Sequence, residues 1–522
     1  MTIPWLTILA LLPAVGAVAL IFTGVKAAKQ VALVVSLITF VFAVIVATQF
    51  RIGGGMQLVE QVPWIKPLGA YYALGLNGLG LTLVLLVVII TPVVIIASWR
   101  DFDPIDVGPE LVEEPGAATI APKYDARMFF ALILAVQSCA LYLFLATDVF
   151  LFYVFFEVIL VPMYFLIGGF GPGPRRTYAA AKFLIFGLLG GFVMLASVIG
   201  LYVQSSRVGQ PSYLLSTLSQ LDIATGTGRW LFVGFMFAFA IKAPLVPLHT
   251  WLPDAAEEST AGGATMMVGV MDKIGTFGMI RFCLGLFPEA SQWATPVVLV
   301  LATISILYGA LLAIGSRDIM RFIAYTSISH FGFIVLGIFA FTSQSLTGST
   351  LYMLNHGLAT AALFVMAGYL VKRRGSRDMS AYGGVDRVAP VLAGLLLFAG
   401  LNTLSLPGLG SFVSEFMVLA GTFGRHPAYA VVSTLAIVLA ALYILIMYQR
   451  TMTGPADPQV VEKVTDINGR ERLAMAPLVL LIVALGVFPK PLLSIIEPTT
   501  QATMQHVGVT DPQPRVTAEG GR

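Results

Sequence analysis

Long apolar runs alternate with short polar loops along nearly the whole chain. Each run is close to the roughly 20 residues that a helix needs to cross a bilayer. No positive charge precedes the first run and another run follows it, so we interpret the first run as a retained span rather than a cleaved signal. The pattern therefore predicts about fourteen spanning helices, at 3–22, 31–50, 77–99, 127–146, 148–169, 179–203, 230–251, 262–287, 295–315, 320–341, 349–371, 390–423, 428–449 and 473–496.

Composition supports a polytopic, all-α membrane protein. Of the 522 residues, 58% are hydrophobic and only 11% are charged, whereas soluble domains carry roughly 25% charged residues. The net charge of +3 is too small and too dispersed for a nucleic-acid surface. The two cysteines, Cys139 and Cys283, lie far apart in apolar runs, so the sequence offers no disulfide framework, metal motif or iron–sulfur motif.

We interpret two of the predicted spans as broken helices. The seventh carries Pro244 and Pro247, and the twelfth, 390–423, carries Pro407-Gly408. These spans are five apart, and an odd offset inverts the topology, which is typical of inverted repeats with ion sites near the membrane midplane. We therefore expect two inverted five-helix repeats, spans four to eight and nine to thirteen, each with a broken helix. The corresponding divisions of the chain are 1–126, 127–290, 291–450 and 451–522, the last with a polar, flexible tail after 497.

Basic residues gather in the loops on one side of the predicted bundle. The loops after spans one, three, five, nine, eleven and thirteen hold most of them, and the opposite loops carry only Arg51, Lys66, Arg207, Arg229 and Arg425. Basic loops face the cytoplasm in most membrane proteins. We therefore expect both termini on the outer side, which agrees with an even number of spans.

Two carboxylates occupy the middle of predicted spans. Glu157 has apolar neighbours on every side, and Glu415 follows the Pro407-Gly408 break by about two turns. A carboxylate there costs about 2.5 to 3.5 kcal/mol on insertion scales unless it faces a partner or water. We interpret both as functional; the alternative is a structural pair with a neighbouring helix.

Basic residues in the spans complement these carboxylates. Burial disfavours an ammonium and a nearby carboxylate favours it, so Lys242 and Lys273 can each hold or release a proton as a partner moves. His249 follows Lys242 by seven residues and would share its face if the helix continued. Lys182, near the start of its span, could be functional or reach the interface. Asp272, beside Lys273, could be a local counter-charge or a supporting group.

Histidines in the second half extend the same series. His330 follows Tyr325-Thr326-Ser327-Ile328-Ser329, and His356 follows Asn355. A lone histidine is often only a hydrogen-bonded core residue, but two on successive helices beside hydroxyl and amide groups favour a proton relay. The predicted relay lies along the membrane plane and consists of Glu157, Lys182, Lys242, Lys273, His330, His356 and Glu415. Such a thin chain suits protons better than an organic solute, although a stand-alone solute transporter and a scaffold with static pairs remain alternatives.

Four segments resemble a known family. Lys242 to Ala255, Tyr325 to Gly332, Asn355 to Leu358, and Leu406 to Phe416 are similar to the antiporter-like subunits of proton-pumping NADH:quinone oxidoreductase, respiratory complex I. Within that family the chain most resembles the M branch, the counterpart of mitochondrial subunit 4. Glu415 stands where the L and N branches usually have lysine, and the chain stops without the long lateral helix of L. Glu257-Glu258-Ser259-Thr260 departs from the family's usual Ala-Pro-Thr before the eighth span, which leaves the cytoplasmic entrance to be determined.

The resemblance implies a role for each matched position. Glu157 and Lys242 would form a switchable pair, Lys273 a connecting proton carrier, His330 and His356 part of a central polar axis, and Glu415 the terminal carrier.

The resemblance also implies the setting of the chain. It would be a proton-translocating subunit, without a redox centre of its own, of an enzyme complex that uses NADH, FMN, iron–sulfur clusters and quinone. Its partners would be lipid and the other membrane subunits, including sibling antiporter-like subunits, in a bacterial plasma membrane. A subunit of a multisubunit sodium/proton antiporter, which shares most of these motifs, is the alternative.

Overall fold

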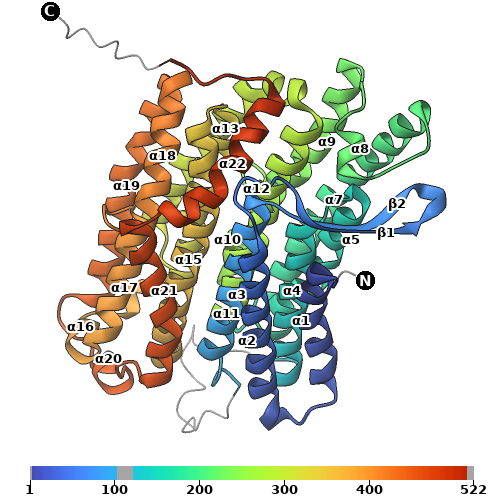
Figure 1. The fold of residues 1–522 in the computed structure, drawn as a ribbon. Helices are drawn as coiled ribbons and strands as arrows, with labels where there is room; N and C mark the ends of the chain where they lie inside the picture. Colours follow the sequence, from blue (N-terminus) through green and yellow to red (C-terminus); the bar gives the residue numbers. More distant parts are fainter. Residues whose placement is uncertain (1–2, 103–120, 514–522) are drawn as a thin grey trace, which may run out of the picture.

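The computed structural model describes residues 3–102 and 121–513, and it is a bundle of long helices standing side by side (Figure 1). The elements of the first half are α1 (Trp5–Ile21), α2 (Val25–Gln49), β1 (Gln57–Ile65), η1 (Lys66–Leu68), β2 (Ala70–Leu76), α3 (Gly78–Ala97), α4 (Ala126–Leu145), α5 (Val149–Val158), α6 (Leu160–Phe170), α7 (Arg176–Val208), α8 (Leu215–Leu218), α9 (Thr225–Lys242), α10 (Trp251–Glu257), α11 (Ala261–Met266), η3 (Met267–Met271), α12 (Lys273–Gly278) and η4 (Met279–Leu284).

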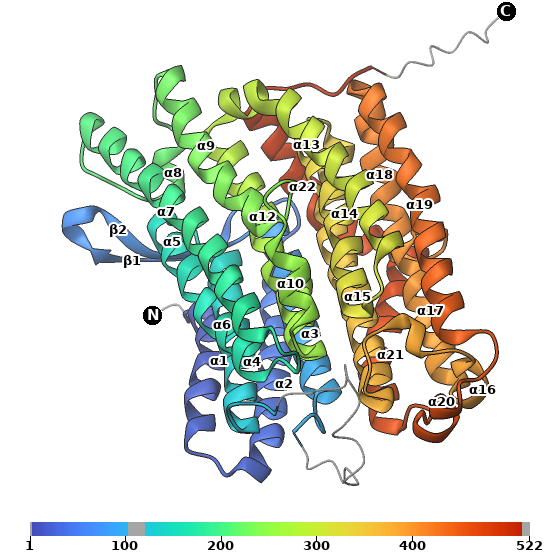
Figure 2. The ribbon, with the colours of Figure 1, turned by 180° about the vertical axis from the view of Figure 1, so that it is seen from behind.

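The named elements in the described part of the second half are all helices. Its elements are α13 (Pro288–Gly315), α14 (Ile319–Phe339), α15 (Ser343–Arg374), η5 (Met379–Ala381), α16 (Val385–Val388), α17 (Pro390–Thr403), α18 (Gly410–Arg425), α19 (Pro427–Met452), α20 (Pro458–Lys463), α21 (Gly469–Val487) and α22 (Lys490–Val507). The view from behind shows α10, α12, α14 and α15 in the middle of the bundle (Figure 2). Three of the seven residues of the predicted relay, Lys273, His330 and His356, lie on these central helices.

The membrane class predicted from the sequence agrees with the fold. Within the described residues, nine helices are long and apolar enough to cross a membrane, or ten if the bent pair α21 and α22 forms one span. Several of the other predicted spans are interrupted or short rather than single long helices. The integral-membrane assignment therefore stands, and the number of spans depends on how interrupted helices are counted.

A β-hairpin corrects the all-α prediction. Strands β1 and β2 pair in antiparallel fashion and project sideways from the bundle (Figure 1). Gly69 makes the turn with φ of +64°, and a Cβ there would lie 1.9 Å from the backbone oxygen of Pro211. Only glycine fits such a left-handed, crowded position. The hairpin was missed because a window sized for spanning helices averages over strands of nine and seven residues.

The end of the chain also departs from the prediction. α21 stops at Val487, where Pro491 cannot supply the next N–H, and α22 then runs at 70° to it as far as Val507. Residues 497–507 are thus helical, not a flexible tail as predicted. Buried positions on α22 recur every three or four residues, which places one face against α3 and α15: Leu492, Ile496, Thr500, Met504 and Val507. The predicted tail beyond 513, like part of the predicted loop at 100–126, lies outside the described residues.

Both predicted helix breaks are present. Residues 243–250 separate α9 from α10, and residues 404–409 separate α17 from α18. The carbonyls freed at the end of α9 find new donors: the Leu245 N–H bonds to Ala240 O at 3.0 Å, and the Trp251 indole N–H bonds to Ile241 O at 3.0 Å. These bonds satisfy two of the carbonyls that the break frees, which lowers the cost of burying an unwound backbone there.

The predicted span 262–287 is irregular in a way that the apolar pattern does not reveal. It runs through α11, the π-helical turn η3, α12 and a second π-helical turn η4. A π-helical turn inserts an extra residue, changes the face that later side chains occupy, and is frequent at functional sites. The first of these turns directly precedes Asp272 and Lys273.

Candidate functional site

Glu157 lies at a kink between α5 and α6. Pro162 lacks the N–H that would bond the carbonyl of residue 158, so the helix is interrupted just after Glu157. The half-buried carboxylate packs against α7, where a Cβ on Gly191 would lie 1.5 Å from its Oε1. The same Oε1 has no hydrogen-bond partner within the described chain. Gly191 thus makes the room that this carboxylate occupies.

Lys242 is the last residue of α9, immediately before the break. The negative end of the helix dipole favours a cation at this position. The side chain is 2% exposed, its Nζ lies 4.7 Å from the centre of the Phe156 ring, and that Nζ has no hydrogen-bond partner among the described residues. No salt bridge joins it to Glu157 in this part of the chain. Glu157 and Lys242, the predicted switchable pair, are therefore not hydrogen-bonded to each other in this structure.

Lys182 belongs to an ion-pair network at one end of the bundle. Its Nζ lies 2.7 Å from Asp254 Oδ2 on α10, and Arg321 of α14 lies 2.8 Å from the other oxygen of Asp254. Arg321 also pairs with Glu257. Lys182 thus connects α7 to α10 rather than reaching solvent alone. Asp254 bridges two cations and was missed as a site residue, although it stands in the 242–255 motif.

The segment 257–260, which differs from the family's usual Ala-Pro-Thr, contributes its acidic residues Glu257 and Glu258 to this network. The guanidinium of Arg377 lies 3.8 Å from Glu258 and 3.4 Å from Asp318. Burial raises the pKa of Asp318 to about 6, and the charge of Arg377 opposes the rise. Burial likewise raises the pKa of Glu258, again against Arg377. The ion pairs that these carboxylates make with Arg377 hold the connecting segments together at this end of the bundle.

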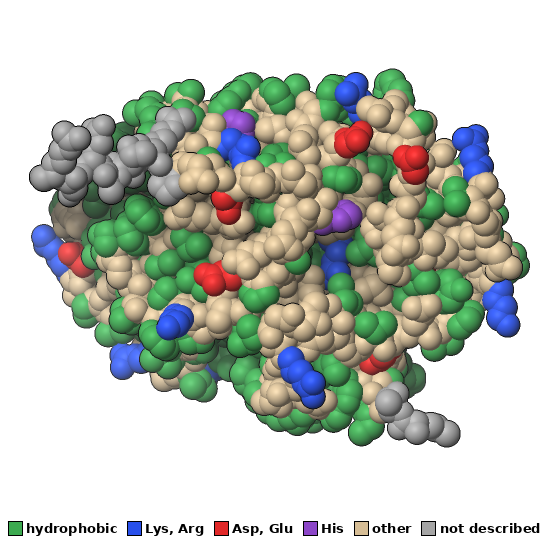
Figure 3. Space-filling model, turned by 45° about the horizontal axis from the view of Figure 1, so that its top comes forward, with side chains coloured by type: hydrophobic (Ala, Val, Ile, Leu, Met, Phe, Trp, Pro, Cys, Tyr) green, Lys and Arg blue, Asp and Glu red, His purple; other side chains and the backbone are tan. Residues whose placement is uncertain are grey.

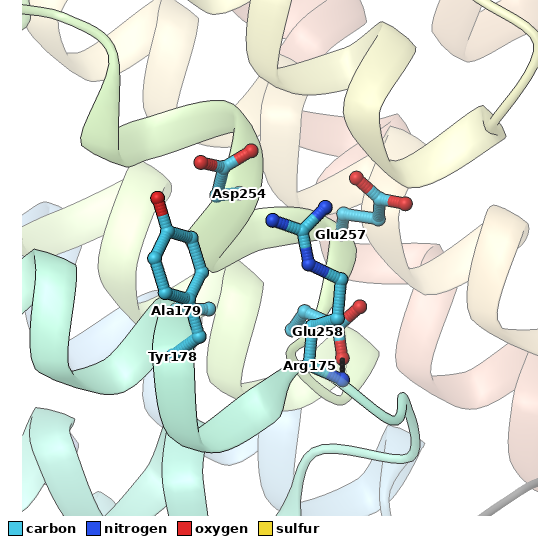
Figure 4. A pocket seen from close by; sticks show the side chains of 6 residues that line it. All are labelled: Arg175, Tyr178, Ala179, Asp254, Glu257 and Glu258. Carbon is cyan, nitrogen blue, oxygen red and sulfur yellow. Dashed lines mark hydrogen bonds between the residues drawn. The ribbon is translucent and has the colours of Figure 1, made fainter.

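A small pocket opens at this network (Figure 4). It has a volume of about 10 Å³, enough for about one water molecule. Asp254 points toward it from α10, while the Arg175 backbone N–H donates to Glu258 Oε2 at 3.1 Å (Figure 4). The pocket thus has room for about one water molecule beside Asp254, the carboxylate that pairs with Lys182.

His249 lies within the break rather than on a continuation of α9. The structure therefore does not support the shared helix face considered from its spacing to Lys242. The ring is 5% exposed and meets Tyr308 edge-on, with ring centres 5.5 Å apart. Its Nδ1 has no hydrogen-bond partner in the described part of the chain.

Lys273 and His356 are in direct contact at the centre of the bundle. The Lys273 Nζ lies 2.7 Å from His356 Nδ1 and donates to the Val268 carbonyl at 2.7 Å. The ammonium has no acceptor role, so it donates to Nδ1 and the ring proton of His356 sits on Nε2. That Nε2 has no partner among residues 3–102 and 121–513.

His330 continues the chain from His356 to Glu415. The two imidazole centres are 5.5 Å apart. His330 Nδ1 lies 2.6 Å from the Tyr352 hydroxyl, which donates to Glu415 Oε2 at 2.6 Å. Since the hydroxyl proton is used on Glu415, the His330 proton sits on Nδ1 and its Nε2 is a bare acceptor. The Nε2–H of His356 and the Nε2 of His330 are therefore a matched donor and acceptor.

Tyr352 and Ser405 were missed by sequence reasoning. Ser405 Oγ donates to the same Glu415 oxygen at 2.6 Å from the break between α17 and α18. Tyr352 precedes His356 by four residues, which puts both on one face of α15. That spacing was a usable signal, but a tyrosine in an apolar run is easily assigned to the core.

A larger cavity lies near the start of α13, away from the ion-pair network. It has a volume of about 310 Å³ and is lined by the base of the hairpin, the start of α3, η4 and α22. Arg281 lines it and donates to Asn77 Oδ1 at 3.2 Å. Charged side chains on this end of the molecule are few and scattered (Figure 3). In the described residues, no group of three or more His, Cys, Asp or Glu could hold a metal ion.

One protein family matches the part of the chain that contains both helix breaks and the buried titratable residues. The family described as "NADH:quinone oxidoreductase/Mrp antiporter, TM" matches residues 146–440, which include every predicted relay residue. The chain belongs to this family. Its curated relatives include NADH-quinone oxidoreductase subunit M of Mycobacterium tuberculosis, 48% identical over 98% of this chain and 96% of that protein. Subunit M of Escherichia coli K12 is 34% identical over 94% and 96%.

Solved structures of the NADH:quinone oxidoreductase/Mrp antiporter family share the fold. A chain of respiratory complex I from Thermus thermophilus with bound NADH has a TM-score of 0.85 and 30% identity, covering 97% of this chain and 100% of that chain. A chain of the Mrp complex from Dietzia sp. DQ12-45-1b has a TM-score of 0.81 at 20% identity, covering 97% and 100%. The second likeness concerns the fold alone.

Proposed function

We propose that this chain is the proton-translocating M subunit of a respiratory NADH:quinone oxidoreductase. The observation that carries the proposal is the buried chain from Lys273 through His356, His330 and Tyr352 to Glu415. Its hydrogen bonds of 2.6 to 2.7 Å are interrupted only between the two imidazoles, whose centres are 5.5 Å apart and whose unpartnered Nε2 atoms are a donor and an acceptor. A single proton can pass along such a chain by successive short transfers.

The pair Glu157 and Lys242 supplies the switch. In the buried state an ammonium and a carboxylate attract each other far more strongly than in water, so bringing Glu157 and Lys242 together or apart changes how firmly Lys242 holds its proton. Quinone reduction elsewhere in the complex would drive that movement. The proton would then pass from Lys242 towards Lys273 and leave through Glu415, with Lys182 and His249 on the supply side of Lys242.

The finer architecture is part of the proposal. Counting α5 with α6, α9 with α10, α11 through η4, α17 with α18, and α21 with α22 as single spans gives fourteen spans together with the other long helices. Spans four to eight and nine to thirteen would be the inverted repeats, with divisions at 126, 290 and 450. The breaks in the seventh and twelfth spans support this symmetry. Both termini would lie on the outer side of a bacterial plasma membrane.

The partners follow from the same assignment. The chain would bind other membrane subunits of the complex, including sibling antiporter-like subunits, and lipid. NADH, FMN, iron–sulfur clusters and quinone would be bound by other subunits. This chain would contribute proton transfer, not electron transfer.

The decisive experiment is to replace Glu157 with Gln and Lys242 with Met in the native complex. We expect each variant to abolish proton pumping in proteoliposomes while the complex still assembles and reduces ferricyanide with NADH. Glu462→Gln and Lys490→Met, at exposed positions, are matched controls that should pump normally. Normal proton-to-electron stoichiometry in Glu157→Gln or Lys242→Met would refute the proposed roles.

A subunit of a multisubunit sodium/proton antiporter is the second candidate, favoured by the shared fold and family. Isolation of the native assembly decides between the two. Co-purifying flavin and iron–sulfur subunits with NADH:quinone activity would support the respiratory complex. Small hydrophobic companions with sodium-dependent transport and no NADH oxidation would support the antiporter. A small-solute transporter is disfavoured because single titratable side chains form a thin chain and not a solute pocket.

A further inference from the structure

Asp272 is a buried carboxylate that the proposed relay does not yet use. Its side chain is 0% exposed, and neither carboxylate oxygen has a hydrogen-bond partner within the described residues. Burying such a group without partners costs several kcal/mol. It follows the π-helical turn η3, which sets the direction of Asp272 and Lys273. An unsatisfied carboxylate in the middle of the bundle calls for a function.

Asp272 is not the counter-ion of its neighbour. Lys273 Nζ binds the Val268 carbonyl and His356 Nδ1, and no salt bridge to Asp272 exists in the described chain. Adjacent residues on a helix point about 100° apart. Lys273 therefore faces α15 while Asp272 faces a different neighbour.

That neighbour is the last turn of α9. Gly275 follows Asp272 by three residues and shares its helix face. A Cβ on Gly275 would lie 2.5 Å from the Ala243 nitrogen and 2.7 Å from the Phe239 oxygen, so this face packs directly against the turn that carries Lys242. The Asp272 carboxylate interacts electrostatically with both Lys242 and Lys273. The residue that precedes α12 thus presents a carboxylate towards the turn that carries Lys242, and the first residue of α12 presents an ammonium to His356.

We propose that Asp272 is a proton-binding site that connects Lys242 to Lys273. The Lys242 ammonium gives a proton to the Asp272 carboxylate, leaving a neutral amine and a carboxylic acid. Once the Lys273 ammonium has passed its own proton to His356 Nδ1 and become a neutral amine, the acid gives its proton to that amine, which restores the carboxylate and re-forms the ammonium. Within the described residues, Lys242 Nζ and both Asp272 oxygens have no hydrogen-bond partner. One intervening water or a change of rotamer therefore completes the first step. This inference rests on the proposed function.

The test uses the whole complex reconstituted in liposomes with quinone. Asp272→Asn keeps the shape but cannot carry a proton, Asp272→Glu keeps the acid, and Asp386→Asn is a matched control at an exposed position on α16. We expect pumping-coupled NADH:quinone turnover in Asp272→Asn to fall about tenfold or more. Its solvent deuterium isotope effect should rise because proton transfer becomes rate-limiting. Asp272→Glu should restore most turnover, and ferricyanide reduction should be unchanged in all variants.

Parallel variants make each outcome decisive. Unchanged turnover and isotope effect in Asp272→Asn, together with loss of pumping in Lys242→Met, would overturn the role of Asp272 alone. Normal pumping in Lys242→Met would instead overturn the proposed function. If Asp272→Asn does not assemble, Asp272→Leu replaces it, because exchange of a buried charge for an apolar group is often tolerated. Failure of both to assemble would assign the carboxylate to folding and overturn the proposal.

Discussion

Replacing Tyr352 with Phe removes one hydroxyl from the middle of the buried chain and leaves the ring in place. That hydroxyl makes two bonds of 2.6 Å, one to Glu415 Oε2 and one to His330 Nδ1. A hydrogen bond to a charged group contributes about 1.5 to 3 kcal/mol and one between neutral groups about 0.5 to 1.5 kcal/mol. Since Ser405 still binds Glu415, we take the loss as about 2 to 3 kcal/mol. That corresponds to roughly 30- to 150-fold in the rate of the proton step.

The assay is proton uptake into liposomes that contain the purified complex, measured by quenching of a pH-sensitive dye during NADH:quinone turnover. Tyr369→Phe is a matched control on the same helix, because Tyr369 is buried and its hydroxyl has no hydrogen-bond partner among the described residues. NADH:ferricyanide reduction reports assembly in both variants. Equal pumping by Tyr352→Phe and Tyr369→Phe would refute the hydroxyl link between His330 and Glu415.

Two further predictions test other parts of the site. Gly191→Ala should displace the Glu157 carboxylate, whose Oε1 would lie 1.5 Å from the new Cβ, and should lower pumping severalfold. Gly394→Ala is the control and should leave pumping unchanged, because nothing lies within 4 Å of a Cβ at that position. Unchanged pumping in this control would refute a general effect of replacing helix glycines. Burial raises the folded-state pKa of Asp318 to about 6, so the folded protein binds this proton more tightly than the unfolded chain. Between about pH 4 and 6, the Asp318 contribution to stability should therefore fall as pH rises. The midpoint temperature of unfolding should lose part of this pH dependence in Asp318→Asn, and an unchanged profile would contradict the assignment.

The sequence was most informative where a residue conflicts with lipid. Glu157, Lys242 and Glu415 are conspicuous because a charge in an apolar run needs a reason. The two breaks were equally visible, because proline removes a backbone donor wherever it stands. Both kinds of signal are local, so a single sequence displays them.

Other parts of the site depend on contacts between distant segments. Nothing near Tyr352 indicates that its hydroxyl meets Glu415, which is 63 residues away. The π-helical turn before Asp272 changes the direction of that side chain and has no distinct apolar pattern. The hairpin and α22 were missed for a different reason. A hydropathy window of spanning length averages over short strands and runs across the bend after Val487.

The two imidazoles impose an order on successive protons. A ring that accepts a proton on one nitrogen and releases one from the other ends in the opposite tautomer. After one transfer, His356 carries its proton on Nδ1 and His330 on Nε2, so neither ring can accept again from the Lys273 side. The rings must reorient, or return their protons, before a second transfer. The pair His356 and His330 therefore passes one proton and then stays in the opposite tautomeric state until it is reset. This limits the pair to one proton per reset and opposes a continuous leak.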